Sequence, residues 1–193
     1  LITTSPTIDG VLSPDEWKGT ALLVLERNHR DEPAHPRSVA HVGFDEAALY
    51  IGMRNLINPH NALKIGRSWG KDDAIEVALR RRNSDPDSPI VVLRAFADGW
   101  SYGSNAGGME LEAARAAGRQ CTYAATLAEP LRWLAEVRIP WTAIPGSDGK
   151  PCELQFNLTC NKTADKLFLC WKPTGRRSHG VGEEGIIIPK QGD

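Results

Sequence analysis

The sequence predicts an all-β domain, a two-sheet antiparallel β-sandwich of jelly-roll type with one or two short helices. Short apolar stretches separated by turn residues recur along the chain, and the 3.6-residue period of long amphipathic helices is scarce. About ten short strands in one domain favour a sandwich or jelly roll over an α/β fold. The 193 residues, 41% hydrophobic and 24% charged, suit a single compact domain spanning residues 1–193.

Each expected strand is a short apolar or alternating run bounded by turn residues. In chain order, the strands are expected at Ala21–Glu26, Ser38–Phe44, Leu49–Arg54, Asp73–Arg80, Ile90–Ala97, Cys121–Leu127, Leu131–Ile139, Leu154–Cys160, Leu167–Trp171 and Gly185–Ile188.

Two stretches favour short helices. In Ser13–Trp17 the serine can cap a helix, the proline suits its first position, and two acids follow at its positive end, which predicts about one helical turn. Glu110–Ala117 also favours a helix, with Gly118 as a candidate stop, although the same stretch could form a loop.

Alternation within the strands predicts which side chains point away from the core. In Asp73–Arg80, for example, Ile75, Val77 and Leu79 form an apolar row, so Glu76 must point the other way. If the strands share one sheet, its far face is dense in charged and amide groups, and such a surface suits a polyhydroxylated ligand, although an outward polar face can also simply meet water. This predicted far face carries Glu76, Arg94, Glu136, Arg138, Gln155 and Asn157.

Charge and composition exclude some partners. Lys and Arg total 23 against 24 Asp and Glu, a net charge of -1 without a long basic run, which argues against nucleic acid or an anionic membrane as a partner. No apolar run approaches the roughly 20 residues of a membrane span. Because Leu1–Pro6 lack an initiator Met and signal-peptide features, we expect a mature or excised piece of a longer polypeptide whose targeting segment is not present.

The four cysteines leave the redox compartment open. Cys160 and Cys170 flank a polar turn and could lie opposite each other on paired strands, where a disulfide is one hypothesis and two small buried apolar residues the other. The pairing of Cys121 and Cys152 is open as well. No CxxC pair occurs and the histidines lie far from the cysteines, so a zinc site has little support.

Five blocks, in order over nearly the whole chain, resemble conserved blocks of family 9 carbohydrate-binding modules. The resemblance is carried by Ile8–Leu12 with Glu16–Trp17, Val42–Asp45 with Leu49–Ile51, Trp69–Glu76, Trp133–Trp141, and Gln155–Leu158. It implies a jelly-roll sandwich that binds saccharides without cleaving them, often appended to a secreted polysaccharide-degrading enzyme. An exported setting, in the medium, the periplasm or the cell envelope, and fusion to further domains are therefore expected.

The resemblance also implies a site. In that family two tryptophans clamp a terminal sugar ring while charged and amide groups bond its hydroxyls. Trp69 stands where the first clamp tryptophan stands, Arg94 matches a sugar-bonding arginine, and Glu76 belongs to the acidic motif. The plan is physically sound, because the apolar face of a pyranose packs on an indole and buried hydroxyls need partners.

The chain departs from the family at the second clamp. The corresponding loop, residues 175–180, has no tryptophan; His179 could stack there, or Arg176 or Arg177 could lay a guanidinium on the ring. Trp171 lies on an expected strand and is assigned to the core. The predicted ligand-binding set is therefore Trp69, Glu76, Arg94, Asn157, Arg176 and His179, with Trp100 as a second exposed candidate.

Other functions remain open at this point. The module could be degenerate and kept for protein contacts, or Glu76 and Glu136 could be the paired carboxylates of a glycoside hydrolase. A haem-binding sandwich would need Met53 or Met109 as an iron ligand together with His or Lys. No cofactor is expected; the resemblance implies that structural calcium can bind, and suitable carboxylates are present, although no contiguous calcium loop occurs. These carboxylates are Asp9, Asp45, Glu46, Asp72 and Asp73.

Overall fold

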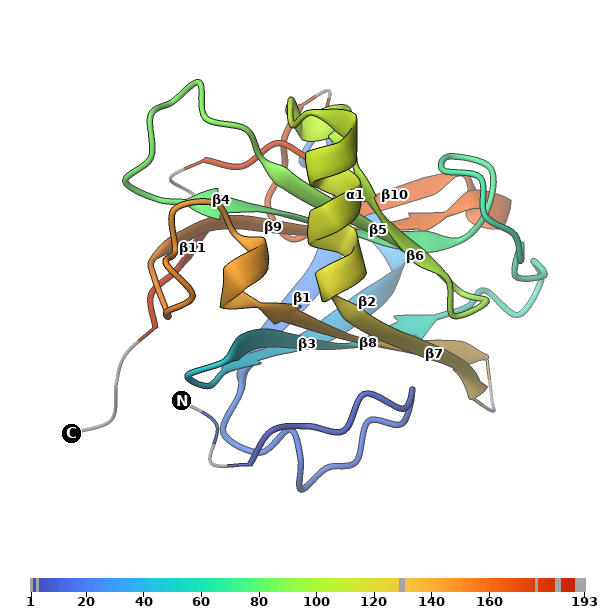
Figure 1. Ribbon diagram of the computed structural model, residues 1–193. Coiled ribbons are helices and arrows are strands. Elements are labelled where there is room, and N and C mark those ends of the chain that lie inside the picture. Colours follow the sequence, from blue (N-terminus) through green and yellow to red (C-terminus); the bar gives the residue numbers. More distant parts are fainter. Residues whose placement is uncertain (1, 3, 129–130, 176, 183–184, 190–193) are drawn as a thin grey trace.

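The computed structural model describes residues 2, 4–128, 131–175, 177–182 and 185–189. Its strands are all paired antiparallel, in the order β6-β5-β4-β9-β10-β1-β2-β3-β8-β7, with β11 paired to β9. The sheet folds over on itself as a β-sandwich of two layers that are joined at one edge, where β1 pairs with β10 (Figure 1).

The two layers have the following strands. The upper layer in Figure 1 holds β6 (Ser101–Ser104), β5 (Val91–Phe96), β4 (Ala74–Arg81), β9 (Leu154–Lys162), β10 (Leu167–Cys170) and β11 (Ile186–Ile187). The lower layer holds β1 (Ala21–Asn28), β2 (Pro33–Phe44), β3 (Ala48–Leu56), β8 (Arg132–Pro140) and β7 (Thr122–Ala128). Three 3-10 turns, Asn105–Gly107, Trp141–Ala143 and Thr163–Asp165, and one helix, α1 (Leu111–Gln120), complete the described elements.

The core lies between the layers, as the alternation predicts. Ile75, Val77 and Leu79 of β4 meet the inner row of β8, from Trp133 to Ile139, in one buried apolar cluster. The predicted all-β sandwich is confirmed, and every predicted strand corresponds to an observed one within a few residues.

One strand escaped prediction. Residues 101–104 show no alternation of apolar and polar side chains, so nothing in their sequence marks a strand. Strand β6 forms because it pairs with the edge of β5, where Arg94 lies opposite Tyr102. Residues 14–19 form consecutive turns instead of the expected helical turn, since Trp17 is drawn into contact with the lower layer.

Helix α1 covers the gap between the edge strands β6 and β7 (Figure 1). It continues through Gly118 to Gln120, so the expected stop at this glycine is wrong. Gly118 instead allows close packing: a Cβ there would lie 2.2 Å from the backbone nitrogen of Gly103 on β6. The hydroxyl of Tyr123 on β7 also donates to the carbonyl of Phe96, 2.8 Å away, which helps to close the sandwich. Within the described residues, no helix has the length and apolarity to cross a membrane.

The N-terminal segment covers the outer face of the lower layer (Figure 1). It is anchored by Glu136 of β8, which accepts hydrogen bonds from the backbone nitrogens of Asp9 and Gly10 and from Nε1 of Trp17, at 2.7–3.1 Å. Burial raises the pKa of Glu136, and these donors oppose the rise.

The cysteine register rules out the hypothetical disulfide. Cys160 pairs with Leu169 and Cys170 pairs with Thr159, so the two cysteines are one register position apart and point to opposite faces of the layer. Cys160 faces the core, and all four cysteines are free thiols. Burial raises the pKa of both, to about 11 for Cys160 and about 12 for Cys170.

We expect all four thiols to be alkylated when the protein is denatured in iodoacetamide without reductant, because no disulfide protects any of them. Intact mass spectrometry counts the added groups. A product that carries two groups would contradict the free-thiol arrangement.

Gly103→Ala should lower the free energy of unfolding by roughly 1–3 kcal/mol, because its Cβ would lie 1.8 Å from the carbonyl oxygen of Ala114 and force α1 off the sheet. Urea denaturation followed by circular dichroism measures the change. Gly182→Ala is the matched control, since a Cβ there meets no atom within 4 Å. Equal stability of the two variants would contradict the close approach.

Candidate functional site

A row of polar side chains crosses the outer face of the upper layer. Cross-strand pairing places Tyr102 of β6 beside Arg94 of β5, Arg94 beside Glu76 of β4, and Glu76 beside Thr159 of β9. Since side chains of directly paired residues lie on the same face of a sheet, the row is continuous. It lies on the face opposite the core, as predicted for Glu76 and Arg94.

Glu76 and Arg94 form a buried ion pair at the centre of this row. Nε of Arg94 lies 2.7 Å from Oε2 of Glu76; the Glu76 side chain is 0% exposed and that of Arg94 14%. Nη1 of Arg94 also points at the hydroxyl of Tyr102, 3.4 Å away. Burial lowers the pKa of Arg94, but the hydrogen bonds with Tyr102 and Glu76 outweigh it and leave the pKa raised, so the guanidinium is firmly charged.

Trp69 stands beside this ion pair. The guanidinium carbon of Arg94 lies over the indole, 4.6 Å from the ring centre, and the ring meets Phe168 of β10 edge-on at 6.2 Å. The indole is only half-buried. The sequence prediction that Trp69, Arg94 and Glu76 adjoin is thus realised in space.

A tight turn presents the indole. The carbonyl of Ser68 accepts hydrogen bonds from the backbone nitrogens of Lys71 and Asp72, both at 3.0 Å, and the Asp72 carboxylate accepts one from the backbone nitrogen of Ser68. Gly70 has a φ of 79°, in the left-handed region that favours glycine. These hydrogen bonds hold the backbone in a tight turn at the point where Trp69 leaves it.

Among the described residues, three buried polar atoms at this face have no hydrogen-bond partner. They are Oε1 of Glu76, Oγ1 of Thr159 and Nδ1 of His179. Burial lowers the pKa of His179, Glu76 opposes this, and Arg94 and Arg177 lower it further, which places the imidazole in the field of the ion pair and leaves it neutral at pH 7. Unsatisfied buried polar groups are uncommon, and a ligand hydroxyl or water is the ordinary partner for such atoms.

The side chain of Asn157, in contrast, is fully engaged in hydrogen bonds to the backbone. Its side-chain nitrogen donates to the carbonyls of Lys172 and Gly180, at 2.9 and 3.2 Å, and its oxygen accepts from the backbone nitrogens of Lys172 and Leu158. The amide thereby fixes both ends of the loop that carries His179. Arg176, the other predicted residue of that loop, lies outside the described residues.

Sequence reasoning did not single out two members of the polar row. Thr159 alternates with the inward residues Leu158 and Cys160, so the same alternation that placed Asn157 outside could have found it. Tyr102 lies on β6, which carries no recognisable pattern, and only the pairing with β5 brings it to Arg94.

Glu136 and Arg138 do not belong to this face. The prediction that they share one polar face with Glu76 and Arg94 is therefore wrong. Both lie on β8, in the other layer, and alternate with core residues, so they point away from the sandwich on the opposite side. The core therefore separates Glu76 from Glu136, and these two carboxylates do not flank one cleft as the glycoside-hydrolase alternative requires.

The residues considered for metal or haem do not form a site. Among the described residues, no three His, Cys, Asp or Glu side chains come together as ligands for a metal ion. Of the candidate calcium carboxylates, Asp9 and Asp45 accept backbone hydrogen bonds within their own turns and Asp73 accepts one from Thr163, so these three do not fit a shared cation. Met53 is fully buried in the core.

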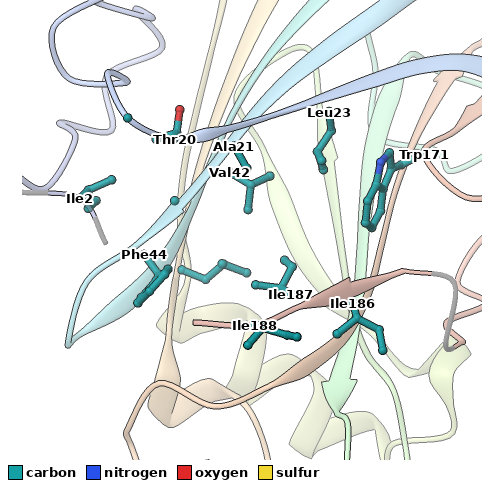
Figure 2. Close-up of a pocket in the computed structure, with 13 residues that line it drawn as sticks. Ile2, Thr20, Ala21, Leu23, Val42, Phe44, Trp171, Ile186, Ile187 and Ile188 are labelled. Atoms are coloured by element: carbon teal, nitrogen blue, oxygen red, sulfur yellow. The ribbon is translucent and has the colours of Figure 1, made fainter. Parts of the chain in front are cut away.

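Trp171 belongs to a different part of the molecule. It lines an apolar pocket of about 330 Å³ between the layers, together with Leu23, Phe44 and the isoleucines of β11 (Figure 2). The hydroxyl of Thr20, at the rim, donates to the carbonyl of Trp17. The pocket offers little for sugar hydroxyls to bond, and Trp171 faces away from Trp69 and Arg94, so it does not act as a second clamp.

The fold resembles that of solved carbohydrate-binding structures. A family 9 carbohydrate-binding module from Caldicellulosiruptor kristjanssonii, solved with glucose, superposes with a TM-score of 0.60 and 15% identity over 89% of this chain and 88% of that one. Its complex with cellotriose gives 0.59 and 15% over 98% and 96%. A candidate carbohydrate-binding protein from Bacteroides uniformis gives 0.55 and 16% over 91% and 88%.

No protein-family model and no curated protein sequence matches the chain. The structural likeness nevertheless extends over nearly the whole length of both chains. The chain therefore has the β-sandwich fold of family 9 carbohydrate-binding modules, as the ordered sequence blocks indicate.

Arg94→Met should lower the free energy of unfolding by about 3 kcal/mol, because it leaves the Glu76 carboxylate buried without its cation. Chemical denaturation measures the loss. Arg115→Met is the matched control: its ion pair with Glu112 is exposed and should contribute about 0–1 kcal/mol. If the two variants were equally stable, Glu76 and Arg94 would not form the buried pair described.

Proposed function

We propose that this domain is a non-catalytic saccharide-binding module whose site is built around Trp69, Arg94 and Glu76. The observation that carries the proposal is the contact of a half-buried indole with a buried, charged arginine, next to polar atoms that lack partners. Flat aromatic surface and fixed charged donors are the two elements that bind pyranose rings. The solved structures of the same fold that hold glucose and cellotriose support the proposal.

The roles of the three residues follow from their burial. Arg94 covers one face of Trp69, so a sugar ring packs on the remaining exposed indole surface and meets the outer nitrogens of the guanidinium with its hydroxyls. Glu76 is completely buried and acts first by orienting Arg94. Oε1 of Glu76 is buried too and has no partner among the described residues, so a hydroxyl reaches it only after the surrounding side chains move.

His179 and Asn157 complete the proposed site from the other side. Asn157 positions the loop after β10, and this loop brings a neutral imidazole close to Glu76 and Arg94. His179 thus takes the side on which the family has its second tryptophan, with a smaller ring and a hydrogen-bonding nitrogen. The proposal is non-catalytic because hydrolysis of a glycoside ordinarily needs two carboxylates that flank one cleft, and Glu136, the partner considered for Glu76, lies on the other side of the core.

The expected setting is part of the proposal. The resemblance to modules that accompany polysaccharide-degrading enzymes supports an exported protein in which this domain is fused to others. The near-neutral charge of -1 fits an uncharged polysaccharide better than a polyanion.

Trp69→Ala should weaken saccharide binding at least tenfold, because it removes the stacking surface while the ion pair of Arg94 and Glu76 remains. Isothermal titration calorimetry measures the change with glucose, xylose, mannose and their β-1,4-linked trisaccharides; the wild type is expected to bind with micromolar to millimolar affinity. Leu22→Ala, an exposed apolar residue on β1 of the other layer, is the matched control and should leave affinity unchanged.

Two results would contradict the proposal. If the wild type bound none of these sugars nor any glycan of an array, a degenerate module kept for protein contacts would be the better description, and the complete burial of Glu76 would fit it. If Trp69→Ala bound as tightly as the wild type, the saccharide site would lie elsewhere. Thermal unfolding of each variant shows that the comparison concerns folded protein.

A further inference from the structure

The arrangement at Trp69 occurs twice on the same side of the upper layer. Trp100, in the turn between β5 and β6, has Arg67 over its ring with the guanidinium carbon 5.4 Å from the ring centre, and Nε of Arg67 lies 2.6 Å from Oδ2 of Asp98. This repeats the chemistry of Trp69, Arg94 and Glu76: an indole, an arginine over it, and a carboxylate that holds the arginine.

Trp100 is both exposed and fixed. It is 36% exposed, whereas Trp17, Trp133 and Trp141 are buried. Its ring packs against Tyr102 at 5.1 Å and Phe96 at 5.6 Å between centres, and its backbone nitrogen donates to Oδ1 of Asp98. An exposed aromatic ring that is already held in place loses little conformational entropy when a ligand packs on it.

The two units adjoin. Tyr102 takes part in both, because its hydroxyl faces Nη1 of Arg94 while its ring packs on Trp100. Arg67 precedes Trp69 by two residues in the same loop. A ligand that lies on Trp69 and extends past Arg94 and Tyr102 therefore reaches Trp100 next.

The arginines differ in how firmly they are held. The side chain of Arg67 is 60% exposed, so solvent weakens its ion pair with Asp98, whereas the side chain of Arg94 is only 14% exposed. A sugar ring can therefore displace Arg67 from the indole at little cost. The displaced guanidinium can then bond the sugar hydroxyls, because Arg67 directly precedes the hydrogen-bonded turn at Ser68 that carries Trp69.

We propose that Trp100, Arg67 and Asp98 form a second saccharide subsite, contiguous with the Trp69 site, so that the domain binds a chain of sugars in preference to a single ring. The proposal rests on the proposed function at Trp69 and extends it. It assigns the ligand class as an oligosaccharide or polysaccharide of at least two rings.

The test compares mono- and trisaccharides on the wild type and on Trp100→Ala by calorimetry, with glucose and cellotriose, xylose and xylotriose, and mannose and mannotriose as probes. In each pair that binds, the trisaccharide should bind the wild type about tenfold more tightly than the monosaccharide. Trp100→Ala should remove this difference and leave monosaccharide affinity unchanged. Trp100→Phe, which keeps a ring, should restore part of it.

The outcomes separate this inference from the proposed function. Equal affinity of the wild type for a monosaccharide and its trisaccharide, or an unchanged preference in Trp100→Ala, would overturn the second subsite while the Trp69 site stands. Loss of monosaccharide binding in Trp100→Ala that Trp100→Phe does not restore would also overturn it, because Trp100 would then only support Arg94 through Tyr102. No binding of any probe would overturn both. Leu22→Ala again serves as the control.

Discussion

The buried ion pair of Arg94 and Glu76 is the interaction on which the proposed site depends. It spans neighbouring strands on the outer face of the sheet, with Glu76 fully covered and Arg94 nearly so. Burial makes the pair costly to break, since either charge alone would be desolvated without compensation. The same burial fixes the guanidinium over Trp69, so one side chain is at once half of an ion pair, the neighbour of Tyr102 and the support of the indole. A flexible surface arginine could not keep these three contacts together.

The two outer faces of the sandwich have different roles because different segments cover them. The N-terminal segment lies on the lower layer, where Glu136 satisfies three donors and Trp17 is buried, so this face is structural. On the upper layer, two loops supply Trp69 and His179, and some buried polar atoms have no partner in the part of the chain that the structure describes. The contrast explains why equally outward glutamates, Glu76 and Glu136, have unrelated roles.

Alternation and local turn chemistry predicted much of the fold. The inward rows of β4, β8 and β9 are those expected from the sequence, because a period of two fixes which side chains share a face. The errors have physical reasons. Gly118 was expected to end a helix, but the helix continues through it and packs closely against Gly103. A contact between residues that are distant in the chain leaves no local signal. The disulfide hypothesis fails because Cys160 and Cys170 lie one register position apart across β9 and β10, which sends their side chains to opposite faces.

The sequence by itself determined the all-β architecture, the outward direction of Glu76 and Arg94, and the place of Trp69 in a loop just ahead of Glu76. These properties depend on neighbours along the chain, which the sequence displays. Only the tertiary structure decided that Glu136 lies on the far side of the core, that Tyr102 extends the polar row, and that Trp100 repeats the arrangement at Trp69. These properties depend on which strands pair and how the sheet folds over itself, and no local pattern encodes the pairing of segments that are far apart in the chain.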